Sequence, residues 1–223
     1  MFRKRTFFLI LITLALILVF GGIINLHLDL RLLALTPKIF KYRRLIQKYA
    51  VKENLDSRLV CALIVQESGF KENARSSAGA EGLTQLIPMT AKELGVEDPL
   101  DAEQNIAGAA RYLHTLYHAF SESEDAHQHR LVLASYNGGI GRVRDAQALV
   151  RHRKNADPLL WEPVRDALSQ LTRQHTDMHR EVWGSDVPPH GYFEGFDETL
   201  DYVERVMHYY GRIRFYRNVL FFL

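Results

Sequence analysis

From Asp56 towards the C-terminus, apolar residues recur at the spacing of α-helices, and this periodicity restricts the fold more than any other feature of the sequence. After Asp101, for example, the apolar positions are Ile106, Ala109, Ala110, Leu113 and Leu116. No stretch of useful length alternates between apolar and polar residues, as a half-buried strand would, and no segment is repeated. The 223 residues suffice for one domain with its own core plus an appendage. We therefore expect an all-α domain.

Capping residues, glycines and prolines delimit the expected helices. Asp56 or Ser57 is placed to cap the first one, and Gly69 suits its C-terminal end. The expected helical ranges are 57–67, 88–94, 101–117, 130–136, 141–151, 158–171 and 198–216. Residues 175–195 contain several glycines and two adjacent prolines, so we expect an irregular loop there, long enough to suggest a function.

The N-terminal sequence predicts attachment to a membrane. Three basic residues at positions 3–5 precede a nearly unbroken apolar stretch from Phe7 to Asn25, long enough to span a bilayer as a helix of roughly 20 residues. A cleaved signal peptide is the alternative, but no convincing small-x-small cleavage site follows Phe20. We therefore expect a single transmembrane helix in residues 1–25, as a membrane anchor or uncleaved signal. Basic residues lie on both sides of this stretch, so their distribution does not decide its orientation.

Residues 26–48 form a basic, apolar segment next to the expected anchor. Pro37 is expected to interrupt it, and apolar pairs at 39–40 and 45–46 indicate a short amphipathic helix. This helix could lie on the membrane surface or pack on the domain as its first helix. Residues 217–223 form a hydrophobic tail, for which core packing, a partner contact and a membrane contact all remain open.

Composition and residue usage exclude several classes of function. A net charge of +2 argues against a dedicated nucleic-acid-binding protein. The single cysteine, Cys61, allows no internal disulfide and lies in an apolar run, so we interpret it as a core residue. His114 and His118 are one helical turn apart and raise the alternative of a zinc enzyme. No His-Glu-x-x-His pattern or third ligand accompanies them, so we expect neither a metal nor another cofactor.

Glu67 is the strongest catalytic candidate in the chain. It ends an apolar helical run, where the helix dipole is negative, and its neighbours one turn back are Leu63 and Ile64. Both surroundings disfavour the charged carboxylate, so we expect a raised pKa. A carboxylic acid that stays protonated near neutral pH is what cleavage of a glycosidic bond requires. The alternative is a solvated glutamate at a helix end.

Three further clusters contain candidate binding residues. Residues 76–86 include two glycines that let the backbone approach a ligand, and Gln85 offers both a donor and an acceptor to a sugar. Tyr136 and Asn137 stand at the end of an expected helix, and Glu198 stands near the start of the last one. Taken singly, each cluster is also compatible with an ordinary turn or a capped helix end.

In combination, the four clusters are recognisable. The chain reads Gln-Glu-Ser-Gly-Phe at 66–70, Gly-Ala-Glu-Gly-Leu-Thr-Gln-Leu at 79–86, Ser-Tyr-Asn-Gly-Gly at 135–139 and Glu-Thr-Leu-Asp-Tyr-Val at 198–203. This order resembles the lytic murein transglycosylases of the soluble-lytic type (SLT), over residues 49–216. Residues 145–161 are similar to part of the catalytic domain of the membrane-bound lytic murein transglycosylases of type F. The resemblance implies a goose-type, lysozyme-like helical domain.

The resemblance also implies roles for individual residues. Glu67 matches the catalytic acid and base of the family. The residues implied to bind substrate or support the site are Ser68, Ser76, Gln85, Tyr136, Asn137, Glu198 and Tyr202. Thr84 departs from the family, which often has methionine at this position. The departure concerns one contact with the substrate and not the implied reaction.

The implied activity is non-hydrolytic cleavage of the β-1,4 bond between N-acetylmuramic acid (MurNAc) and N-acetylglucosamine (GlcNAc) in peptidoglycan, leaving 1,6-anhydroMurNAc ends. Such an enzyme would work in the bacterial cell envelope, anchored in the inner membrane with its catalytic domain in the periplasm. Its partners would be glycan strands, the membrane and unidentified envelope proteins. The alternatives are a goose-type-lysozyme-like muramidase and a non-catalytic peptidoglycan-binding scaffold.

Overall fold

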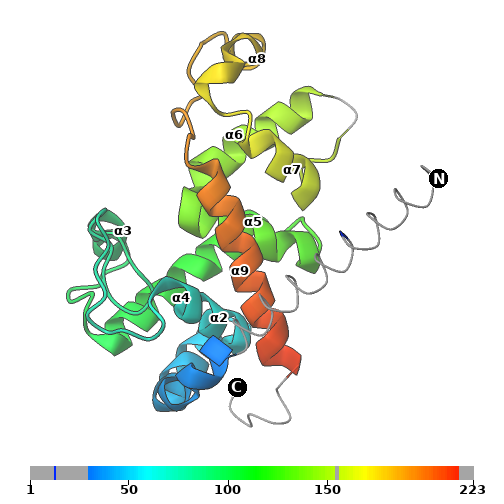
Figure 1. The fold of residues 1–223 in the computed structure, drawn as a ribbon. Helices are drawn as coiled ribbons and strands as arrows, with labels where there is room; N and C mark the ends of the chain where they lie inside the picture. Colours follow the sequence, from blue (N-terminus) through cyan, green and yellow to red (C-terminus); the bar gives the residue numbers. More distant parts are fainter. Residues whose placement is uncertain (1–12, 14–29, 154–155, 216–223) are drawn as a thin grey trace, which may run out of the picture.

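The computed structural model describes residues 13, 30–153 and 156–215, and this part of the chain is helical (Figure 1). It contains no β-strand, only isolated bridges that join Glu81 to Arg75 and to Leu86. The expected all-α architecture is therefore confirmed for the described residues. Within the same residues, no helix is long and apolar enough to cross a membrane. Apart from Thr13, the expected anchor at 1–25 lies outside the described residues, as does the tail at 217–223.

From residue 57 onward, the described helices mostly agree with the predicted ones. They are α2 (Ser57–Glu67), α3 (Pro88–Glu93), α4 (Ala102–Ala119), α5 (Asp125–Gly138), α6 (Ile140–His152), α7 (Trp161–Leu168), the 3₁₀ helix η1 (Arg173–His175), α8 (Thr176–Trp183) and α9 (Phe196–Phe215). The prediction of an irregular segment over 175–195 was wrong at α8. This helix is only two turns long, too short for a clear apolar period. It is held by buried His179, which hydrogen-bonds to the backbone oxygens of Gln170 and Asp186.

The core is built around α2. Every residue from Leu59 to Val65 is buried, including Cys61, so this helix is covered on all sides. It packs against α9, which in turn packs on α5. Figure 1 shows α9, in orange and red, running across the molecule, with α2 and α4 beside its lower half, α3 out to the left, and α6, α7 and α8 towards its orange end. Hydrogen bonds tie both ends of α2 to α9, since Tyr202 donates to Glu67 at the C-terminal end of α2 and Tyr210 donates to Asp56 at its N-terminal cap.

A helix over residues 30–52 precedes α2 and continues through Pro37, so the predicted interruption there was wrong. Pro37 lies on the exposed face, where water can satisfy the carbonyl that loses its N–H partner. The opposite face is buried in the core through Leu32, Ile39, Tyr42, Ile46 and Ala50. Arg31 adds a hydrogen bond of 2.9 Å from Nη2 to the Val65 carbonyl. Of the two alternatives for this segment, packing on the domain is the one observed.

Candidate active site

Glu67 is positioned by a well-defined helix start and stop. Asp56 caps α2 by accepting a hydrogen bond of 2.9 Å from the Arg58 backbone N–H. Past the other end, Gly69 and Phe70 adopt left-handed conformations, with φ of +56° and +59°. These two residues turn the chain sharply away, so Glu67 occupies the last helical position of α2.

The Glu67 carboxyl group lies against the side chain of Tyr202 from α9, whose hydroxyl donates a hydrogen bond of 2.6 Å to Oε1. Burial raises the pKa of Glu67 to about 7, although the Tyr202 hydroxyl acts in the opposite direction by stabilising the charged form. Glu67 as a whole residue is half-buried and keeps some exposure to solvent. The structure therefore provides an acid that is substantially protonated at neutral pH, on a residue that is not fully enclosed by the core.

A second tyrosine faces the same region. Tyr136 of α5 donates a hydrogen bond of 2.9 Å from its hydroxyl to the Thr84 carbonyl. Burial, and then the charge of Glu67, raise the pKa values of Tyr136 and Tyr202 well above their ordinary range. Both phenols therefore stay neutral and act as hydrogen-bond donors. The structure thus brings together Glu67, Tyr136 and Tyr202, which are far apart in the sequence.

The loop between α2 and α3 is held against the end of α2 by Ser68. Its hydroxyl donates to the Leu83 carbonyl at 2.7 Å, and its side chain is buried. Gln85 uses its amide nitrogen within the loop, donating to the carbonyls of Ala74 at 3.1 Å and Gly82 at 2.9 Å. Ser76 accepts from the backbone of Ala80 at 3.0 Å, and these contacts shape the loop.

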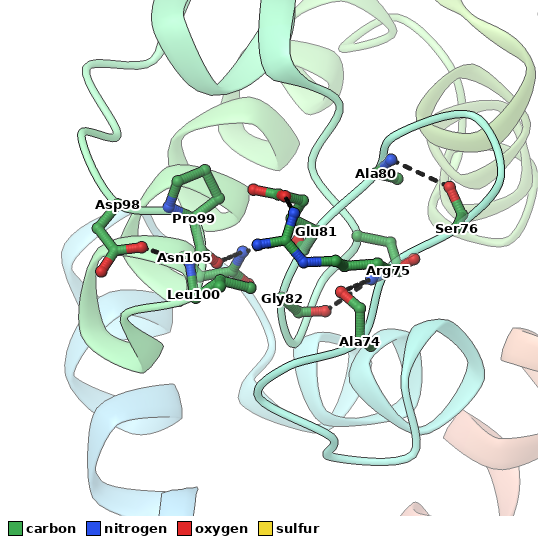
Figure 2. Close-up of polar contacts among 11 residues, drawn as sticks. Ala74, Arg75, Ser76, Ala80, Glu81, Gly82, Asp98, Pro99, Leu100 and Asn105 are labelled. Atoms are coloured by element: carbon green, nitrogen blue, oxygen red, sulfur yellow. Dashed lines mark hydrogen bonds and ion pairs between the residues drawn. The ribbon is translucent and has the colours of Figure 1, made fainter.

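Asn105 of α4 anchors the same loop, and sequence reasoning missed it. Figure 2 shows its side chain between the Glu81–Gly82 turn and Pro99. Its Nδ2 donates to the carbonyls of Glu81 at 3.1 Å and Pro99 at 2.8 Å. Its Oδ1 accepts from both the backbone and the hydroxyl of Thr84, at 2.8 and 2.7 Å. The only sequence signal was a polar residue within an apolar helical period.

These contacts explain two features of the loop sequence. Thr84 is fully buried and its hydroxyl donates to Asn105, so the residue that departs from methionine serves a contact between the loop and α4. Gly82 has φ of +80°, and a Cβ built there would lie 2.1 Å from the Pro99 carbonyl oxygen and 2.4 Å from Asn105 Nδ2. No side chain fits at position 82 unless this anchor moves.

The remaining predicted residues lie where α5 meets α9. Asn137 is exposed, and its Oδ1 accepts a hydrogen bond of 2.6 Å from the hydroxyl of buried Thr199, a link that the sequence did not reveal. Glu198 is exposed one turn before Tyr202. In the part of the chain that the structure describes, no hydrogen bond or ion pair joins Glu198 to Glu67.

No metal site emerges from the described residues, among which no group of three or more histidine, cysteine, aspartate or glutamate side chains is arranged to hold an ion. His114 forms a hydrogen bond of 3.0 Å between Nδ1 and the Glu53 carbonyl. His118 lines the same surface pocket as His114, at the N-terminal end of α2. These histidines therefore lie at the opposite end of α2 from Glu67.

Comparison with known sequences identifies relatives. The Transglycosylase SLT domain family matches residues 44–158. Membrane-bound lytic murein transglycosylase F of Desulfosudis oleivorans is 39% identical over 175 residues, which cover 78% of this chain and 36% of that protein. The protein of the same name from Vibrio cholerae is 36% identical over 181 residues, covering 81% of this chain and 32% of its own length. The chain thus spans about a third of the length of these curated relatives.

Solved structures show the same fold. Lytic transglycosylase Slt from Pseudomonas aeruginosa, crystallised as an inactive mutant, aligns with a TM-score of 0.52 and 25% identity, over 77% of this chain and 24% of that one. The 70 kDa soluble lytic transglycosylase from Escherichia coli aligns with a TM-score of 0.53 and 23% identity, over 78% of this chain and 24% of that one. The fold of these proteins is the one that the sequence predicted.

Proposed function

Because this chain belongs to the Transglycosylase SLT domain family, we propose that it is a lytic transglycosylase that cleaves the β-1,4 bond between MurNAc and GlcNAc in peptidoglycan without water. The observation that carries this proposal is the carboxyl group of half-buried Glu67, whose pKa is raised to about 7 by burial and which accepts a hydrogen bond from the Tyr202 hydroxyl. An acid with such a pKa can donate a proton and later accept one at neutral pH. One residue can therefore serve both halves of the reaction.

In the first half, protonated Glu67 donates its proton to the oxygen that links the two sugars. The bond from this oxygen to C1 of MurNAc breaks, and GlcNAc leaves with a free 4-hydroxyl. The oxocarbenium ion at C1 is stabilised by the 2-acetamido group of the same sugar. In the second half, the Glu67 carboxylate removes the proton of the C6 hydroxyl while O6 bonds to C1. The 1,6-anhydro ring closes, and Glu67 ends protonated as it began.

The electrostatic surroundings of Glu67 support a mechanism with one carboxylate. Most glycosidases place a second aspartate or glutamate within about 5–9.5 Å of the acid. Among the described residues, burial and the Tyr202 hydroxyl are what shift the pKa of Glu67, and no second carboxylate contributes. Glu72, the nearest acidic residue in sequence, pairs with Lys41 at 2.8 Å and accepts from the Tyr42 hydroxyl. A substrate-assisted reaction needs no further acid.

The proposal is tested by mass spectrometry of the fragments released from purified peptidoglycan by the full chain and its Glu67→Gln variant. We expect anhydroMurNAc ends from the wild type, none from Glu67→Gln, and undiminished product from Glu97→Gln, an exposed control. Reducing ends would instead indicate a muramidase. A folded wild type that releases no fragment would favour a binding or scaffold role.

We also propose that residues 1–25 anchor the chain in the inner membrane with the catalytic domain in the periplasm. The apolar stretch from Phe7 to Asn25 supports this, as do the exposed Leu30, Leu33 and Phe40 on the outer face of the helix that follows. Since that helix is packed into the core, we begin the catalytic unit at residue 30 instead of 49. Protease added to spheroplasts should digest the domain, and full protection would contradict a periplasmic location.

A further inference from the structure

A pocket of about 530 Å³ lies beside the end of α2 and takes no part in the mechanism above. Lys38 lines it and places Nζ 3.5 Å from the carbonyl of Gly69, two residues after Glu67. Ala74 lines it too, and the Ala74 carbonyl accepts the hydrogen bond from Gln85. The pocket therefore lies beside the turn that follows Glu67 and beside the start of the loop predicted to contact the glycan.

One wall of the pocket is aromatic and well ordered by its contacts. Tyr42 and Phe70 are buried and stack with ring centroids 5.7 Å apart and an interplanar angle of 14°. The next residue, Lys71, is fixed by a backbone hydrogen bond of 3.3 Å to the Ser68 hydroxyl. The pocket is thus built from the helix over residues 30–52 and from the turn that ends α2.

The pocket carries an excess of positive charge. Its charged side chains are Lys38, Lys41, Lys71 and Glu72. Glu72 pairs with Lys41 at 2.8 Å, so the charges of these two residues offset each other. Among the residues that the structure describes, no ion pair offsets the ammonium groups of Lys38 and Lys71, and the exposed Asn73 lines the pocket with them. Such a pocket favours an anionic ligand that also accepts hydrogen bonds.

We propose that this pocket binds the carboxylates of the peptide stem that MurNAc residues of peptidoglycan carry, an inference that rests on the proposed function. A volume of about 530 Å³ falls within the usual range for ligand pockets and fits a short peptide. Lys38 and Lys41 precede residue 44, where the match to the family begins. The helix over residues 30–52 thus adds a stem-binding wall to the catalytic domain.

The test compares the full chain with its Lys38→Ala/Lys71→Ala variant on two substrates, intact peptidoglycan strands and strands stripped of their stems by an amidase. Loss of two exposed charge contacts should raise KM for the stem-bearing strands about three- to tenfold. KM for stripped strands should stay unchanged. Lys52→Ala, an exposed lysine of the same helix outside the pocket, is the matched control and should alter neither value.

Equal KM values for the variant and the wild type on stem-bearing strands would overturn the inference. An equal rise on both substrates would also overturn it, because the lysines would then act on the glycan or on the fold. Titration calorimetry of a soluble stem tetrapeptide with the Glu67→Gln chain tests the pocket without turnover. Peptide binding that disappears when both lysines are replaced supports the inference, whether or not the wild type cleaves strands. Failure of the wild type to cleave strands would refute only the proposed function. Absence of binding at millimolar peptide would refute the proposal that this pocket binds the peptide stem.

Discussion

Replacing Glu67 by glutamine should stabilise the protein above pH 7 while it abolishes turnover. Burial raises the pKa of Glu67 from its ordinary 4.5 to about 7, so the folded chain keeps a proton that the unfolded chain releases near pH 4.5. Between these values the unfolded state binds fewer protons, and wild-type stability falls as pH rises. At 1.36 kcal/mol per pH unit, the loss reaches about 3 kcal/mol above pH 7. Glutamine carries no charge, keeps an oxygen that can accept from Tyr202, and escapes this loss.

Thermal unfolding of the detergent-solubilised full chain at a series of pH values measures this effect. At pH 4 both forms of the protein should unfold at similar temperatures. The difference between their unfolding temperatures should grow between pH 4.5 and 7 and reach roughly 6–12 °C at pH 8. This range follows from about 3 kcal/mol and a shift of about 2–4 °C per kcal/mol for a domain of this size. The exposed control Glu97→Gln should show no such divergence. Equal stability of Glu67→Gln and wild type at pH 8 would refute the argument that burial sets this pKa.

Three other variants test the arrangement around the site. Tyr202→Phe removes the donor that lowers the pKa of Glu67, so the alkaline limb of the pH–activity profile should move to higher pH; a shift to lower pH would contradict the hydrogen-bond assignment. Gly82→Ala should lower the free energy of unfolding by about 2–4 kcal/mol in urea titrations, because its Cβ would meet backbone and amide atoms. Gly95→Ala, with open space around it, should lower it by about 1 kcal/mol through backbone strain alone. Equal costs for the two variants would refute the steric argument at position 82. Thr199→Val breaks the side-chain bridge between α9 and α5, and should lower unfolding free energy by about 1 kcal/mol in the same titration; no change would show that water replaces the bridge.

Local sequence signals predicted much of the fold because they act over one or two turns. The apolar run of α2, its Asp56 cap and Gly69 beyond its end suffice to locate that helix. The same signals wrongly predicted an interruption at Pro37. Proline is tolerated in a helix where the affected carbonyl faces water, and which helix face is exposed depends on the tertiary structure. The local signals also missed α8, whose stability depends on the buried hydrogen bonds of His179.

The sequence by itself predicted Glu67 as the candidate acid and predicted that its pKa should rise, since Glu67 ends an apolar helix and motifs that resemble those of the family accompany it. Only the tertiary structure decided how the pKa is set, because the competing effects come from enclosure by distant segments and from Tyr202, 135 residues away. The roles of Asn105 and of the lysine pocket likewise depend on segments that meet only in the folded chain. Periodicity reports which residues share one face of a helix, whereas burial and hydrogen bonding depend on which faces are brought together.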